Sequence, residues 1–134
     1  MNFIVDSGVL DRMMDHARAT LPQEACGLLV GRNGQASRFI PTENTLRSET
    51  EYEIDPAFLA ATFRLLRDSG EELVGIFHSH PQGPARPSNR DLERAYYPEA
   101  VHVIVSLADP ESPQIGCFRI IDGQAYDVEL HAIV

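Results

Sequence analysis

Hydrophobic residues recur at helical spacing in two stretches of the chain. In residues 7–20 they include Val9, Leu10, Met13, Met14 and Ala17, a period that predicts a helix with one apolar face. A second helix is predicted to open at Asp55-Pro56, with Asp55 as N-cap and Pro56 at the first helical position. Gly70 ends this helix, because glycine adopts the left-handed conformation of a C-cap.

Short apolar runs bounded by turn residues predict the strands. They cover residues 24–31, 37–40, 73–77, 101–107, 115–121 and 125–130. Asn33-Gly34 and Asp122-Gly123 are hairpin signals between neighbouring runs. Polar and apolar residues alternate in 51–55, which predicts an edge strand whose charged face includes Glu49, Glu51 and Glu53. The order of elements predicts an α/β fold in which helices flank a mixed sheet.

Length and composition favour one domain, residues 1–134, with an ordinary core. Hydrophobic residues make up 43% of the 134 positions, which is typical of a globular domain. No stretch approaches the ~20 apolar residues of a membrane span, and the N-terminus lacks the features of a signal peptide. Two cysteines are too few for a disulfide framework. These features predict a cytoplasmic protein that does not bind membranes.

The formal charge of −9 makes nucleic acid an unfavourable partner. The basic residues are scattered rather than clustered, and an acidic surface repels phosphate backbones. The net charge therefore argues against a nucleic-acid partner but does not indicate which other partner the protein binds. The oligomeric state is not specified by the sequence.

A pair of histidines ends the apolar run at residues 73–77. His78 and His80 project from the same face of a strand, because side chains alternate with period two. Neutral imidazole is a common zinc ligand, so two rings on one face can share an ion. The ordinary alternative is that both rings make structural hydrogen bonds, and a His-x-His pair alone does not decide between them.

Downstream, after an irregular loop at residues 82–87, Ser88-Asn-Arg-Asp91 opens a short helix predicted to reach about Tyr96. Ser88 as N-cap with an acidic residue three positions later resembles a capping box. Asp91 could also turn toward the histidines as a third, anionic ligand. Two histidines and one carboxylate leave the fourth tetrahedral position for water, as in catalytic zinc sites. Ser88 could then present its hydroxyl to a developing oxyanion.

Together His78-Ser-His-Pro81, Ser88 and Asp91 resemble the signature of the JAMM (MPN+, Mov34/MPN/PAD-1) metalloprotease family. The segment from Gln23 to Gly31, which contains Glu24, is similar to the family's upstream glutamate strand, and the likeness extends over nearly the whole chain. The resemblance implies a curved mixed sheet flanked by helices, with cytidine-deaminase-like architecture. It also implies a metal-dependent hydrolase that carries one Zn²⁺ ion and a bound water.

The resemblance assigns roles to five residues. His78, His80 and Asp91 would bind zinc, Ser88 would support the oxyanion, and Glu24 would act as general base and then general acid. A carboxylate within reach of a zinc-bound water can accept its proton and pass it to the leaving amine. Without the downstream motif, Glu24 would be interpreted as an ordinary surface carboxylate.

By the same resemblance, the substrate is the C-terminal tail of a ubiquitin-like or sulfur-carrier protein, cleaved after Gly-Gly, as for stand-alone prokaryotic members of the family. An extended tail could add as a strand, and residues 50–55 are the predicted edge. Two alternatives stay open. One is a non-catalytic MPN-type scaffold, and the other is a zinc hydrolase of another amide, although the deaminase signature is absent.

Five other residues are histidines or cysteines, which are common in active sites, but we predict structural or solvent-exposed positions for them. His102 lies in an apolar strand and is predicted to be a hydrogen-bonded structural residue, with an outer-sphere role as the alternative. His16 and His131 are predicted to be solvated. Cys26 and Cys117 are predicted to be reduced and buried, because free cysteine behaves as a small hydrophobe.

Overall fold

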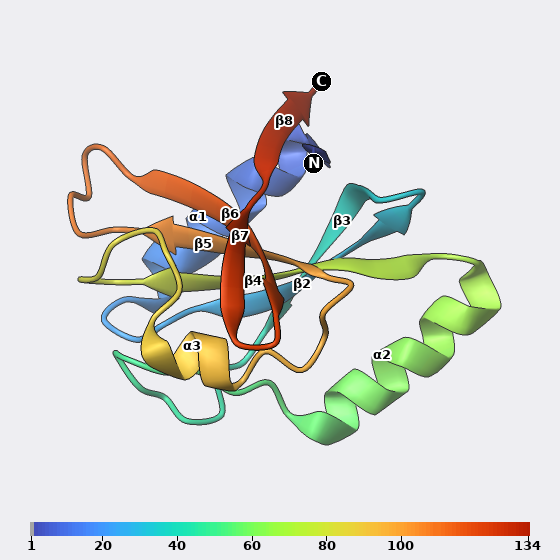
Figure 1. Ribbon diagram of the computed structural model, residues 1–134, viewed down its shortest axis with the longest axis horizontal. Coiled ribbons are helices and arrows are strands. Elements are labelled where there is room, and N and C mark those ends of the chain that lie inside the picture. The colour runs from blue at the N-terminus through green and yellow to red at the C-terminus, as the bar shows by residue number, and fades with distance from the viewer. Residues whose placement is uncertain (1) are drawn as a thin grey trace.

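A computed structural model describes residues 2–134, in which three helices and eight strands follow one another (Figure 1). Their bounds are β1 (Asn2–Asp6), α1 (Ser7–Thr20), β2 (Cys26–Arg32), β3 (Gln35–Thr42), α2 (Pro56–Ser69), β4 (Glu72–His80), α3 (Asn89–Glu93), β5 (Val101–Ser106), β6 (Gln114–Ile121), β7 (Gln124–Asp127) and β8 (Glu129–Ile133). The strands form one mixed sheet in the order β7-β6-β5-β4-β2-β3-β1-β8. The predicted α/β architecture is confirmed.

The sheet curves around α1. Its two outermost strands, β7 and β8, are separated along the chain by Val128 alone, and the Val128 N–H donates to the Cys117 carbonyl of β6. Strands at opposite edges of a sheet can be one residue apart only if the sheet bends back on itself. The apolar face of α1 fills the enclosed space, with Val9, Met13 and Ala17 all buried in the main core.

A smaller apolar cluster covers the opposite face of the sheet. It comprises Cys26, Leu28, Ile54, Ile76 and Ala100, and α2 packs beside it through Leu59. Both predicted ends of α2 are confirmed. The Asp55 carboxylate accepts the Ala57 N–H at 3.0 Å, and Gly70 takes φ 75° as the left-handed C-cap. Among the described residues 2–134, no helix combines the length and apolar character of a membrane span.

The predicted edge strand at residues 51–55 is wrong. This segment is an irregular loop because the Asn44 side chain binds its backbone: Asn44 Nδ2 donates to the Glu51 carbonyl at 3.0 Å, and Asn44 Oδ1 accepts the Glu53 N–H at 3.2 Å. A side chain thus occupies the groups that a neighbouring strand would bind. Glu51 consequently does not belong to a charged strand face, and residues 50–55 do not offer a ready sheet edge to a peptide.

Other elements also differ from the predictions. The unpredicted strand β1 pairs in parallel with β8, from Asn2↔Glu129 to Asp6↔Ile133, so its stability depends on a partner more than a hundred positions away. The predicted strand at residues 125–130 is divided into β7 and β8, because the chain changes sheet edge at Val128. Helix α3 ends at Glu93, short of the predicted end near Tyr96, and none of its residues is buried.

Candidate metal centre

The C-terminal end of β4 positions the two histidines. β4 lies between β2 and β5, and its residues alternate between faces, so His78 and His80 share the face opposite α1. Both are buried, with 1% and 6% of their surface exposed. Their Nε2 atoms lie 3.1 Å apart, so the predicted pairing of the two rings is confirmed as a spatial arrangement.

Helix α3 brings Asp91 to the same point. Asp91 Oδ2 lies 3.1 Å from His78 Nε2 and 3.0 Å from His80 Nε2. The predicted capping box is also present, because Ser88 Oγ accepts the Asp91 N–H at 3.1 Å and Asp91 Oδ2 accepts the Ser88 N–H at 2.9 Å. The carboxylate therefore caps its helix and faces the histidines at the same time.

The chemistry of these atoms fits a bound cation. His80 Nδ1 donates to the Pro84 carbonyl at 2.8 Å, so the Nε2 atom of the neutral ring carries a lone pair. That lone pair faces the Asp91 carboxylate and the second imidazole, which places three electron-rich atoms within 3.1 Å of one another. Ligand atoms around a tetrahedral zinc ion with 2.0–2.1 Å bonds lie roughly 3.3 Å apart. The residues present fit zinc.

The protonation preferences of Asp91 and His78 agree with this chemistry, and that of His80 in the metal-free site does not. Burial alone would raise the pKa of Asp91, but the hydrogen bonds with His78 and His80 outweigh it and hold that pKa below its usual range. Burial lowers the pKa of His78, which favours the neutral ring that a metal requires. At His80, burial also lowers the pKa, but the hydrogen bond with Asp91 leads the effects that raise it above its ordinary value.

Glu24 is buried beside the histidines rather than lying on the surface. Only 3% of it is exposed, and one carboxylate oxygen, Oε1, has no hydrogen-bond partner among the described residues. Burial raises the pKa of Glu24 to about 8. Ligand atoms of Glu24, His78 and His80 all lie within 4.8 Å of one another, a looser set than the one completed by Asp91. Glu24 is therefore a second carboxylate beside the histidine pair.

Two residues that the sequence did not identify fix the backbone around Glu24. Ser79, between the two histidines but on the other face, accepts the Ala25 N–H through Oγ at 2.8 Å and donates its own N–H to the Ala25 carbonyl at 3.0 Å. Asn44 Nδ2 donates to the Glu24 carbonyl at 3.1 Å. The central position of the His-Ser-His motif was a signal for Ser79, because a polar residue on the core face of a strand needs a partner.

Ser88 keeps a donor available. Its Oγ accepts the Asp91 N–H through a lone pair, so its hydroxyl hydrogen is not used by the capping box. Ser88 is half-buried, one helical turn before the Asp91 carboxylate. Its placement is compatible with the predicted contact to an oxyanion.

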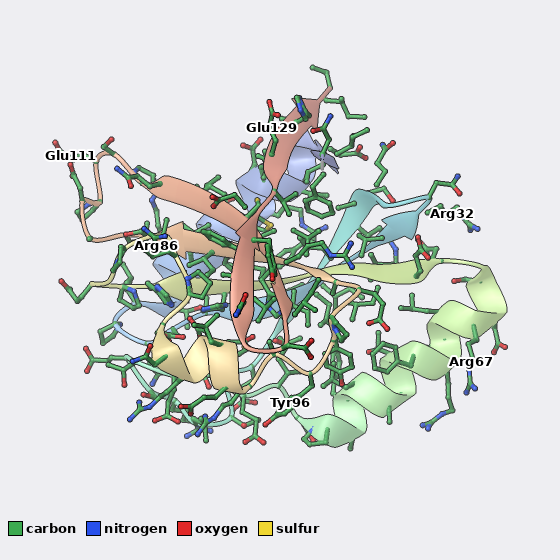
Figure 2. All side chains as sticks on the ribbon, in the orientation of Figure 1. Arg32, Arg67, Arg86, Tyr96, Glu111 and Glu129 are labelled. Carbon is green, nitrogen blue, oxygen red and sulfur yellow. The ribbon has the colours of Figure 1, made fainter. Side chains whose placement is uncertain are left out.

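A cleft of about 670 Å³ adjoins the centre. Asp91 and Arg90 contribute to one side of it, and apolar residues including Ile54, Leu59, Phe63 and Tyr97 contribute to the rest. Tyr52 separates part of this cleft from His78, with the two rings stacked at 4.5 Å and an interplanar angle of 23°. The exposed Tyr96, labelled in Figure 2, lies on the side of the molecule between α3 and α2.

The remaining histidines and cysteines take structural places. His102 is buried, but its Nε2 has no hydrogen-bond partner among the described residues, so the predicted bond is not found at that atom; burial lowers its pKa to about 4. The prediction for His16 is wrong, because it is half-buried and its Nε2 bonds the Cys26 carbonyl at 3.1 Å. His131 is exposed, and Cys26 and Cys117 are buried and free, as predicted.

Comparison with known proteins identifies the family. Residues 6–120 match the family described as prokaryotic homologs of the JAB domain. The chain is 34% identical over 132 residues to the CysO-cysteine peptidase of Mycobacterium tuberculosis, covering 97% of this chain and 90% of that protein. It is 39% identical over 92 residues to the probable TtuB-protein conjugate cleaving protease of Thermus thermophilus, covering 68% and 62%.

Solved structures show the same fold. Protein DSY2949 from Desulfitobacterium hafniense is 34% identical with a TM-score of 0.88, over 98% of this chain and 92% of that one. The JAB1/MPN domain protein AF2198 from Archaeoglobus fulgidus is 21% identical with a TM-score of 0.63, over 97% and 98%. This chain belongs to the prokaryotic JAB-domain family, which confirms the resemblance to JAMM/MPN proteins.

Proposed function

We propose that this protein is a zinc-dependent peptidase or isopeptidase that hydrolyses the bond after the C-terminal Gly-Gly of a ubiquitin-like or sulfur-carrier protein. The observation that carries the proposal is the convergence of His78 Nε2, His80 Nε2 and Asp91 Oδ2 within 3.1 Å of one another. Relatives named as a CysO-cysteine peptidase and a TtuB-protein conjugate cleaving protease support the substrate class.

His78, His80 and Asp91 would hold one zinc ion, with a water molecule in the fourth position. A bound zinc ion lowers the pKa of its water to about 7 and polarises the scissile carbonyl. The hydrogen bond from His80 Nδ1 to the Pro84 carbonyl holds that ring in the tautomer that binds a metal. The stacked Tyr52 ring holds the plane of His78 and keeps bulk water from that side.

Glu24 and Ser88 would move the proton and stabilise charge. Glu24 accepts the proton of the attacking water and returns it to the leaving amine. Its pKa of about 8, raised by burial, suits both steps because neither protonation state is strongly disfavoured near neutral pH. The Ser88 hydroxyl donates to the oxyanion of the tetrahedral intermediate, an interaction worth ~3–4 kcal/mol in comparable sites.

The surroundings of the centre suit an extended peptide. The apolar cleft that adjoins Asp91 offers room for side chains of a tail as its backbone approaches the histidines. The buried, unpaired thiols of Cys26 and Cys117 fit a reducing compartment, and we place the activity in the cytoplasm on that ground.

The test replaces Glu24 with Gln, which retains the shape of the side chain and removes its ability to carry the proton. Carrier proteins ending in Gly-Gly, extended by one amino acid or joined to a lysine side chain, are incubated with enzyme and weighed by mass spectrometry. Glu24→Gln should lower turnover at least ~10²-fold while zinc stays bound. The exposed Glu49→Gln is the matched control and should behave as wild type.

Each outcome of that test assigns a function. Cleavage of the two substrates separately distinguishes peptidase from isopeptidase action. Hydrolysis of small amides without cleavage of carrier tails would identify a zinc hydrolase of another substrate. Failure to bind zinc would identify a scaffold. Unchanged turnover in Glu24→Gln would refute the role given to that residue.

A further inference from the structure

Helix α3 has no fully buried apolar residue, although it carries a carboxylate that must be placed accurately. None of its five residues, Asn89–Glu93, is buried. Its Asp91 carboxylate nevertheless lies 3.0–3.1 Å from two buried imidazoles. A short helix without a fully buried apolar side chain gains from another attachment, because surface segments with few buried contacts open easily.

Glu51 supplies that attachment. Its Oε2 accepts from Arg90 Nη1 at 2.9 Å, and its Oε1 accepts from Arg94 Nη1 at 2.9 Å. The two arginines are four residues apart, so they leave the same side of the helical turn. A single carboxylate thus binds both, with 26% of its side chain exposed against 53% for Arg90 and 48% for Arg94.

The backbone of Glu51 is itself held by the side chain of Asn44. Its carbonyl accepts Asn44 Nδ2 at 3.0 Å, and the same amide group donates to the Glu24 carbonyl at 3.1 Å. Asn44 is only 4% exposed, and its Oδ1 accepts the Glu53 N–H. A continuous set of contacts therefore runs from Glu24 through Asn44 and Glu51 to α3.

We propose that Glu51 is a positioning residue of the metal centre: by binding Arg90 and Arg94 it places α3 so that Asp91 meets the two histidines. The inference rests on the proposed function, since it assumes that Asp91 is a metal ligand. Loss of the attachment should let α3 move and should weaken metal binding, although none of these three side chains touches the ion.

Glu51 could instead act only through its negative charge, and that explanation leads to a different expected result. Glu51 carries a negative charge near a cation site, so removing it could weaken zinc binding through Coulomb attraction alone. Removing two positive charges with Arg90→Gln/Arg94→Gln should then tighten binding. The attachment proposed here predicts that this double variant weakens binding, so the two explanations differ in sign.

The experiment measures zinc affinity by competition with a chromogenic chelator in wild type, Glu51→Gln, Arg90→Gln/Arg94→Gln and the combined triple variant. The control is Glu71→Gln, which removes a carboxylate that binds both Nε and Nη2 of Arg38, with a similarly shielded side chain at 16% exposed. We expect about tenfold weaker zinc binding in the first two variants, no further loss in the triple variant, and less than about twofold change in the control.

Hydrogen exchange of the α3 amides in zinc-free protein gives a second readout. Exchange should accelerate in Glu51→Gln and in the arginine double variant, and should stay at the wild-type rate in Glu71→Gln. Unchanged or tighter zinc binding in the double variant would overturn the inference while leaving the proposed function intact. A wild-type protein that binds no zinc would overturn both.

Discussion

The cores packed against the two faces of the sheet differ in composition. On the α1 face, the core is continuous and apolar except for Ser79, and on the other face a small apolar cluster lies beside buried polar residues that include Glu24, His78, His80 and His102. Strand β4 contributes to both, with Phe77 toward α1 and His78 away from it. One strand can therefore stabilise the core on one side and position reactive side chains on the other, because its side chains alternate.

The largest expected effect is on the α1 face. Phe77 is fully buried and meets the Phe39 ring edge-on at 5.7 Å. Phe77→Ala should lower the free energy of unfolding by about 3–5 kcal/mol, measured by urea denaturation. Phe63→Ala removes the same ring from a half-buried position on the other face and should cost about half as much or less. Equal losses would contradict the division of stability between the faces.

A smaller effect is expected where the loop at residues 82–87 crosses β6. A side chain at Gly116 would overlap the carbonyl oxygen of Ala85, so the loop can lie here only against glycine. Gly116→Ala should cost about 1–3 kcal/mol through overpacking and should loosen the contact of Pro84 with His80. Thermal unfolding measures the first effect and zinc affinity the second.

Gly8→Ala is the control for that substitution. Apart from its chain neighbours and the backbone of its own helix, no atom lies within 4 Å of the added methyl group, and the position is helical, so stability should be unchanged or slightly increased. If Gly116→Ala proved as harmless as Gly8→Ala, the close approach of the loop to β6 would be wrong.

The smallest effect is expected at His102. Its Nε2 has no hydrogen-bond partner among the described residues, so His102→Leu removes a buried polar atom without breaking a bond at that atom. The free energy of unfolding should change by less than about 1 kcal/mol, and could rise. Zinc affinity should also be retained. A loss above about 2 kcal/mol, or a tenfold loss of zinc affinity, would show that the ring has a bound water or another partner that matters.

Features set by local chemistry were predictable from the sequence. The helix ends at Asp55 and Gly70 follow from capping, and the shared face of His78 and His80 follows from the period of a strand. Asp91 could be placed because the spacing from Ser88 allows a capping box and a ligand at once. The role predicted for Glu24 came from the family resemblance alone.

Features set by distant contacts were not predictable. Strand β1 is stabilised by pairing with β8 and β3. No local pattern in the sequence predicts that pairing. Residues 51–55 have the alternation of a strand, yet the Asn44 side chain takes their backbone groups. His16 has no motif around it in sequence, but in the fold it bonds the Cys26 carbonyl. Each difference comes from tertiary contacts that override local pattern.

Two carboxylates, Asp91 and Glu24, could complete the histidine pair, and zinc titration of chelator-treated protein distinguishes them. Our expectation is one ion per chain in wild type and in Glu24→Gln, strongly weakened binding in Asp91→Asn and His78→Gln, and about 2.7 kcal/mol of added stability at a free zinc concentration of 100 Kd. Wild-type affinity in Asp91→Asn, with binding lost in Glu24→Gln, would contradict it.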